Sequence, residues 1–91
     1  MHGGIDRSIP ASYGPMPKRK TAVSEAVGHA IRDARKEHGY TQEAFALAAG
    51  LDRSYMGAVE RGEFNLTLET LLKVAGALGM LVSELLARAG L

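Results

Sequence analysis

The chain has 91 residues, 46% of them apolar but only 5% aromatic, which allows one small domain with a core built mostly from Leu, Val, Ile and Ala. The absence of cysteine excludes disulfides and thiolate metal sites, and no apolar run approaches the roughly 18–20 residues that cross a bilayer. With a net charge of +1, a monomer would be a weak non-specific binder of nucleic acid, because such binding depends on many neutralised phosphates.

Residues 1–21 are predicted to be a flexible basic arm in front of a domain over residues 22–91. Glycines and prolines interrupt any periodic pattern in the arm, and it holds few large apolar side chains. The arm ends in Lys18, Arg19 and Lys20. Two interpretations of this cluster stay open: solvated charges that flank the fold, or an arm that contacts phosphates or a minor groove of DNA.

The first helix is predicted to begin near Ala22 and to end before Gly39. Its apolar residues recur every three to four positions, which marks one stripe that we expect to be buried. These residues are Val23, Val27, Ile31 and Ala34.

Residues 41–55 predict two short helices that meet at a tight corner. Thr41 and Asp52 are good N-cap residues, because a short side-chain oxygen accepts hydrogen bonds from the free N–H groups of a first turn. Gly50 lies where the chain has to leave the first of these helices in a left-handed conformation. Ala46 is small enough to let two helices cross closely. This is the plan of a helix-turn-helix, whose second helix can lie in the major groove of DNA.

These two helices and two later ones complete an all-α chain of five helices. The pair is expected over residues 42–49 and 53–61. A fourth helix follows the N-cap Thr67 and stops at Gly79, and a fifth covers about residues 82–88. No sustained period of two competes with this pattern. The apolar residues expected to face the core are Phe45, Met56, Val59, Leu68, Leu71, Leu72, Ala75, Leu78 and Leu85.

A set of short motifs extends along most of the predicted domain, and their joint spacing is more specific than any one of them. The motifs are Ile31-Arg32, Arg35, Gly39-Tyr40-Thr41-Gln42-Glu43, Phe45-Ala46, Gly50-Leu51, Glu60-Arg61-Gly62, Asn65, Leu68, Leu71-Leu72, Ala75 and Leu78-Gly79. With them the chain resembles the phage-repressor-like (Xre or Cro type) helix-turn-helix family from Val27 to Leu86. The resemblance implies a lambda-repressor-like fold in which the second and third helices form the DNA-reading unit.

The resemblance also implies which residues contact DNA. Gln42 opens the second helix, where the family commonly contacts a phosphate. Arg53 and Ser54 occupy the first exposed turn of the recognition helix, and Gly57 and Ala58 are expected at the next exposed positions. The full set of expected DNA contacts is Thr41, Gln42, Arg53, Ser54, Gly57, Ala58, Asn65 and the arm residues Lys18, Arg19 and Lys20.

Arg53 suits guanine, whose O6 and N7 atoms accept from both arms of a guanidinium, although a phosphate contact alone is the alternative. Ala58 is expected to meet a thymine methyl group. Gly57 costs about 0.5–1 kcal/mol relative to alanine inside a helix. Either close approach to DNA or tight packing unrelated to function would account for this glycine.

Two further positions follow from the resemblance. Arg35 and Glu60 are expected to form a partly buried ion pair between the first and third helices, in which the guanidinium offsets a carboxylate beside the negative end of a helix dipole. After the third helix, relatives usually carry a basic residue that contacts a phosphate, but this chain has Glu63 and Phe64 there. Arg61 is then either a replacement cation or a charge that compensates the helix dipole.

The C-terminal part has more apolar residues than the core needs, and we expect a homodimer formed through the fifth helix and the end of the fourth. Scattered apolar surface residues are the alternative. The residues expected at the dimer interface are Leu66, Met80, Leu81, Val82 and Leu86. Such a dimer would present two recognition helices about 34 Å apart to a palindromic operator.

We therefore expect a cytoplasmic regulator that binds double-stranded DNA sequence-specifically and regulates a small operon, including its own gene. Residues 51–67 are also similar to the recognition segment of restriction–modification controller proteins. Nothing indicates an enzyme: the histidines are scattered, and no phosphate-binding glycine loop or nucleophile elbow is present. No metal, cofactor or small-molecule ligand is expected. The alternative is an antitoxin-like or adaptor module that uses the same fold only to bind proteins.

Overall fold

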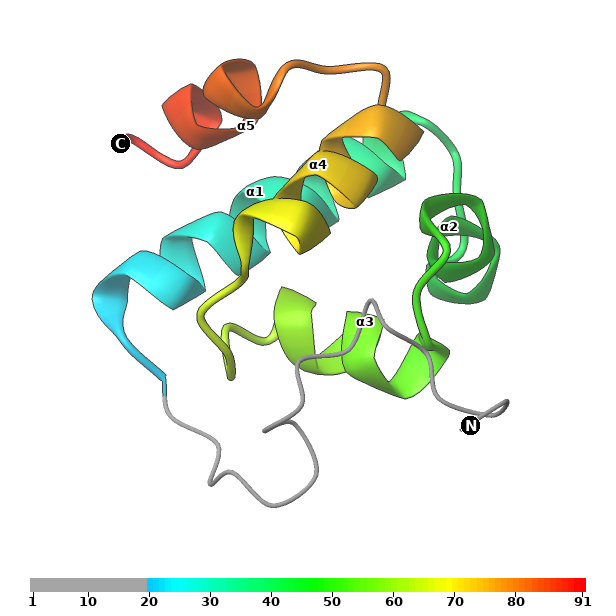
Figure 1. Ribbon diagram of the computed structural model, residues 1–91, viewed down its shortest axis with the longest axis horizontal. Coiled ribbons are helices and arrows are strands. Elements are labelled where there is room, and N and C mark those ends of the chain that lie inside the picture. Colours follow the sequence, from blue (N-terminus) through cyan, green and yellow to red (C-terminus); the bar gives the residue numbers. More distant parts are fainter. Residues whose placement is uncertain (1–19) are drawn as a thin grey trace.

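The computed structural model describes residues 20–91, which form five α-helices and no strand (Figure 1). The prediction of an all-α chain with five helices is confirmed. The further division into an arm over residues 1–21 and a domain over 22–91 stays a prediction, because residues 1–19, with Lys18 and Arg19, lie outside the described range. The helices are α1 (Ala22–Glu37), α2 (Gln42–Ala49), α3 (Arg53–Glu60), α4 (Leu68–Ala77) and α5 (Val82–Arg88).

The helix starts are set by local chemistry. For α1 to α4, an N-cap side-chain oxygen accepts a hydrogen bond from the backbone N–H three residues later. At the start of α5, the Glu84 carboxylate instead accepts from the backbone N–H of Leu81 at 2.8 Å. The side-chain caps of the first four helices are Thr21, Thr41, Asp52 and Thr67.

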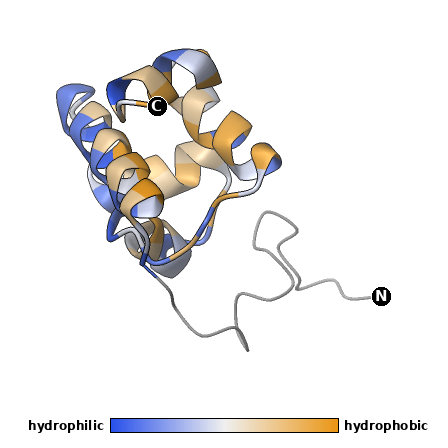
Figure 2. Cartoon of the chain, turned by 90° about the vertical axis from the view of Figure 1, so that its left-hand side faces the viewer, coloured by the Kyte–Doolittle hydropathy of each residue, from blue (hydrophilic) through white to orange (hydrophobic). Residues whose placement is uncertain are grey.

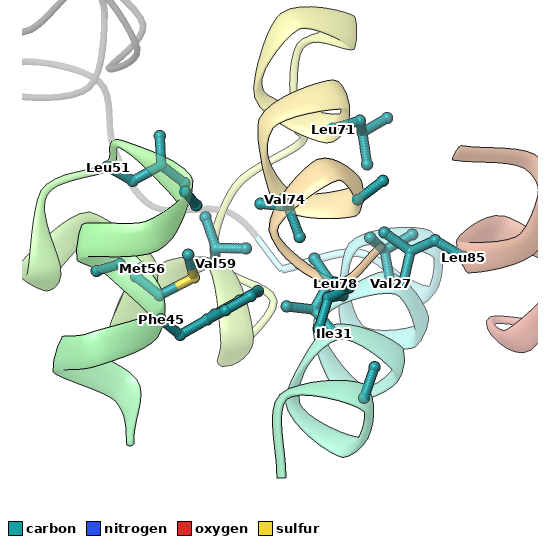
Figure 3. Packing of buried hydrophobic residues seen from close by; sticks show 14 of the residues in the cluster. Val27, Ile31, Phe45, Leu51, Met56, Val59, Leu71, Val74, Leu78 and Leu85 are labelled. Carbon is teal, nitrogen blue, oxygen red and sulfur yellow. The ribbon is translucent and has the colours of Figure 1, made fainter. Parts of the chain in front are cut away.

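A single core lies between the helices, and side chains from all five helices point into it (Figure 3). Hydrophilic and hydrophobic residues alternate along the ribbons, as amphipathic helices around a common core require (Figure 2). The largest buried side chains are fully enclosed. These include Ile31, Phe45, Tyr55, Met56 and Leu85.

The backbones of α1 and α3 touch where the two helices cross. Gly28 is buried there, and a Cβ atom on it would lie 2.6 Å from the carbonyl oxygen of Val59 and 2.8 Å from that of Glu60. One turn earlier, Ser24 Oγ donates a hydrogen bond to the carbonyl oxygen of Gly62 at 2.6 Å. Any side chain at position 28 would overlap the backbone of α3, so this glycine sets how deeply α3 sits against α1.

Three leucine and valine predictions were wrong. Leu68 is 76% exposed and Leu72 is 64% exposed, because α4 packs through the stripe of Leu71, Val74, Ala75 and Leu78, and positions 68 and 72 lie at the flank of this stripe. Val23, in the first turn of α1, is 52% exposed at the edge of the core.

The helices of residues 20–91 were also compared with the length and apolarity that a membrane span needs. No single one of them meets both requirements. The helices α4 and α5 meet them only together, as a pair bent by 89°.

Candidate nucleic-acid interface

The corner between α2 and α3 has the geometry of a helix-turn-helix. Gly50 ends α2 with φ of 70°, a left-handed conformation that glycine adopts without a Cβ clash. The backbone N–H of Leu51 then donates to the carbonyl oxygen of Ala46 at 2.8 Å, which closes the turn. Leu51 and Ala46 are both buried, so the corner is anchored in the core. The direction of α3 relative to α2 is therefore fixed by packing.

The N-terminal turn of α3 projects from this corner. Asp52 caps it by accepting from the backbone N–H of Tyr55 at 3.0 Å. Arg53 and Ser54 are exposed, whereas every residue from Tyr55 to Glu60 is buried. The part of α3 that solvent or a ligand can reach most easily is thus its first turn.

The expected exposure of Ala58 was wrong. Ala58 is 1% exposed and belongs to the hydrophobic core, so its methyl group cannot meet a thymine. The reason is position on the helix: Ala58 follows Tyr55 by three residues and shares its buried face. Gly57 is buried as well, but it lines a surface cleft beside Gln42.

A cluster of hydrogen bonds joins α1, α2 and α3 at the C-terminal end of α3. Arg35 Nε donates to Glu60 Oε2 at 2.7 Å and its Nη2 donates to Oε1 at 3.1 Å, a bidentate pair with side chains 10% and 3% exposed. Arg35 Nη1 also donates to the carbonyl oxygen of Tyr40 at 2.9 Å. Gln42 Nε2 donates to Glu60 Oε1 at 3.2 Å. The first residue of α2 is thereby held against the end of α3.

In the segment after α3, the apolar residue is buried and the two charged residues form an ion pair. Phe64 is buried and its ring centroid lies 5.9 Å from that of Tyr55. Arg61 Nε donates to Glu63 Oε2 at 2.8 Å. The sequence left two interpretations of Arg61 open. The structure adds to them that the guanidinium forms an ion pair with the carboxylate of Glu63, two residues away. Asn65 and Thr41 are exposed, although the Thr41 hydroxyl caps α2.

Sequence reasoning missed two side chains of α1 that lie beside predicted DNA-contacting residues. His29 and Arg32 on α1 line the same cleft as Lys20, Gln42, Gly57 and Arg61. Nothing local in the sequence connects residues 29–32 with 57–61, because the crossing of α1 and α3 brings them together. Among residues 20–91, no cluster of three or more His, Cys, Asp or Glu side chains is placed to hold a metal ion.

Of the expected dimer residues, Met80 and Leu81 lie between α4 and α5, Val82 and Leu86 lie on α5, and Leu66 lies in the loop before α4. Leu81 is 67% exposed, and the other four are partly buried against the core. A second apolar surface lies nearby: a groove of about 320 Å³ lined by residues that include Val23, Phe64 and Leu91, together with Leu66 and Leu86. The other four expected dimer residues are Leu66, Met80, Val82 and Leu86.

Comparison with known proteins agrees with this geometry. A family model described as helix-turn-helix matches residues 31–85. The control protein C.SmaI of Serratia marcescens is 42% identical over 69 residues, which is 76% of this chain and 82% of that protein. The crystal structure of the restriction–modification controller protein C.AhdI from Aeromonas hydrophila matches with a TM-score of 0.69 at 43% identity, covering 71% of this chain and 98% of that one.

A third similar structure was solved in complex with DNA. It is SinR, a master regulator for biofilm formation, with a TM-score of 0.63 at 36% identity, covering 66% of this chain and 97% of that one. These findings confirm the resemblance to phage-repressor-like regulators and to controller proteins. The matched range starts within α1, ends within α5 and includes both helices of the corner. The chain belongs to the helix-turn-helix (HTH_3) family.

Proposed function

We propose that this protein is a transcriptional regulator that binds a palindromic operator in double-stranded DNA as a homodimer, with α3 as the recognition helix. The observation that carries the proposal is the exposed first turn of α3, where Arg53 and Ser54 project from a helix that is otherwise buried. A helix-turn-helix contacts base edges with this end of its second helix. Its similarity to a regulator solved with DNA supports the same use here.

Direct reading of bases rests on few side chains. Arg53 supplies two donors that match O6 and N7 of guanine, and the hydroxyl of Ser54 can donate or accept. Ala58 is enclosed in the core and takes no part. The remaining specificity then comes from the shape of the DNA and from the spacing of the half-sites.

Support for a homodimer comes from the exposed Leu81 and the partly buried apolar residues around α5. A two-fold pair of such chains places two recognition helices about one helical turn apart on DNA. The similarity to the controller proteins C.SmaI and C.AhdI favours control of a small operon that includes the regulator's own gene. Dimerisation would then couple DNA binding to protein concentration.

Selection of bound fragments from a random duplex library tests the proposal. We expect the wild-type protein to enrich one palindromic sequence with a guanine in each half-site. Arg53→Ala should lose preference at that base, at a cost of about 1–3 kcal/mol per half-site. Lys73→Ala on α4, outside the proposed interface, serves as the control and should enrich the wild-type sequence.

Two outcomes would contradict the proposal. Failure of the folded wild-type protein to enrich any sequence would remove sequence-specific binding. A site without two-fold symmetry would remove the homodimer. An antitoxin-like or adaptor protein is favoured by one observation, the exposed leucines Leu47, Leu68 and Leu72, and it predicts the first of these outcomes.

A further inference from the structure

One side of α3 extends from the exposed first turn of the helix to a cleft beside α1. Arg53, Gly57 and Arg61 follow each other at intervals of four residues and therefore lie along one side of the helix. The cleft has a volume of about 430 Å³ and is lined by Gly57 and Arg61 from the α3 side and by His29 and Arg32 from α1. We call it the α1–α3 cleft.

The charges around the α1–α3 cleft leave cations available for a ligand. Glu60 lies in it but is neutralised by Arg35 at 2.7 Å. Arg61 shares Glu63, so this pair contributes little net charge. Within residues 20–91, Arg32 and Lys20 form no ion pair, and they face a single remaining carboxylate, that of Glu25.

A side chain added at Gly57 would enter the cleft, where it would meet the ends of two side chains. The nearest atoms to a Cβ at this position would be Arg61 Nη1 at 3.2 Å and Gln42 Oε1 at 3.3 Å, both at the ends of flexible side chains. Gly28, by contrast, faces fixed backbone atoms. Tight packing within the protein therefore does not explain Gly57. A methyl group there would occupy space in the cleft itself.

The dimensions of α3 place the cleft at the edge of a DNA groove. With a rise of about 1.5 Å per residue, Gly57 lies about 6 Å and Arg61 about 12 Å along the axis from Arg53. The major groove is about 8.5 Å deep. A recognition helix that enters the groove by its N-terminal turn carries Gly57 and Arg61 away from the base edges, which places the cleft nearer the flanking sugar–phosphate backbone.

Resting on the proposed function, we infer that the α1–α3 cleft binds a backbone phosphate next to the half-site read by Arg53, with Arg32 as its main cation and His29 and Lys20 beside it. Gln42, held on Glu60, lies at the edge of this cleft and can donate to the same phosphate. Gly57 leaves the room that the phosphate needs. The first helix thus contributes to DNA binding together with the helix-turn-helix.

The salt dependence of binding tests this site. Each phosphate contact contributes close to one unit to the slope of log K against log salt concentration, so Arg32→Ala should reduce the slope by about 1 per half-site, or about 2 for the dimer, without changing the preferred sequence. The matched control is Lys36→Ala, which removes an exposed cation of the same helix outside the cleft and should keep the wild-type slope. Gly57→Ala should weaken binding at every salt concentration while its thermal unfolding temperature stays equal or rises.

Each of the other outcomes overturns the inference. One is an unchanged slope for Arg32→Ala, and another is wild-type affinity for Gly57→Ala. A third is saturable stabilisation of the wild type by inorganic phosphate that Arg32→Ala abolishes while its DNA slope is unchanged, since the cleft would then bind a free anion. The slopes are also measured on a duplex of random sequence, which needs no operator. A lower slope for Arg32→Ala there supports the phosphate site even if selection returns no palindrome.

Discussion

Glu60 joins three helices through one carboxylate. Its two oxygens accept hydrogen bonds from Arg35 of α1 and Gln42 of α2, and its side chain is only 3% exposed. Arg35 in turn holds the carbonyl oxygen of Tyr40 in the link between α1 and α2. A buried guanidinium without its carboxylate would have most of its donors unsatisfied, which is costly in a region of low dielectric.

We expect Glu60→Ala to lower the free energy of unfolding by about 3–5 kcal/mol, because it removes one partner of a buried pair and leaves the other charge uncompensated. Denaturant titration followed by circular dichroism measures the loss. Glu63→Ala breaks the more exposed pair with Arg61 and should cost about 1 kcal/mol or less. Equal, small losses in the two variants would show that the Arg35–Glu60 pair does not hold the helices together.

At the scale of the helices, the contact between α1 and α3 depends on Gly28. An added methyl group would meet the carbonyl oxygens of Val59 and Glu60 below 3 Å, and backbone atoms in a packed core cannot move aside cheaply. Gly28→Ala should therefore destabilise the fold by about 1–3 kcal/mol, the usual cost of overpacking. Its effect is measured as a lower midpoint of thermal unfolding.

Gly76→Ala is the matched control for this prediction. Gly76 lies within α4, and a Cβ atom there would have nothing within 4 Å. The same substitution should then stabilise the protein by about 0.5–1 kcal/mol through helix propensity. If both variants shift the midpoint in the same direction, the close contact at Gly28 does not limit the packing of α1 on α3.

The elements could be predicted from the sequence because their signals are local. Thr41, Asp52 and Gly50 act on residues within one turn, and they mark the helix ends where the structure has them. Which side of a helix is buried is a different matter. Leu68 was expected to be buried and is exposed, because α4 has an apolar stripe wider than the face that its neighbours cover, whereas Ala58 was expected to be exposed and is buried on the face of Tyr55.

The candidate site was predictable to a similar extent. Arg53 and the pairing of Arg35 with Glu60 followed from the resemblance to a family. The α1–α3 cleft did not, because Arg32 and Gly57 are far apart in the chain and meet only through the crossing at Gly28. The sequence around Arg32 contains no motif that predicts a binding site.

At the scale of the whole molecule, α5 closes the core and also carries the surface proposed for dimerisation. Its end is tied to α1 by an exposed ion pair between Arg88 and Glu37. The hydrogen bond from Arg88 lowers the pKa of Glu37, and the carboxylate raises the pKa of Arg88. Leu81, at the other end of α5, is 67% exposed.

We expect Leu81→Glu to yield a folded monomer that binds operator DNA poorly, because a charge would be buried at the proposed two-fold contact without a partner. Sedimentation at micromolar concentration measures the oligomeric state, and circular dichroism checks the fold. Leu47→Glu alters a leucine that is 82% exposed on α2 and should leave the dimer intact. A Leu81→Glu protein that still sediments as a dimer would place the contact elsewhere.

The exposed first turn of α3 also limits how this protein can be retargeted. Within α3 only positions 53 and 54 are exposed, so under the proposed function they alone offer side chains to a base, while the rest of the helix is buried. A designer who wants a new operator can therefore randomise two codons and screen a few hundred combinations without altering the buried residues of α3. The small number of exposed side chains also limits specificity, since two base-contacting residues per half-site discriminate poorly between similar operators.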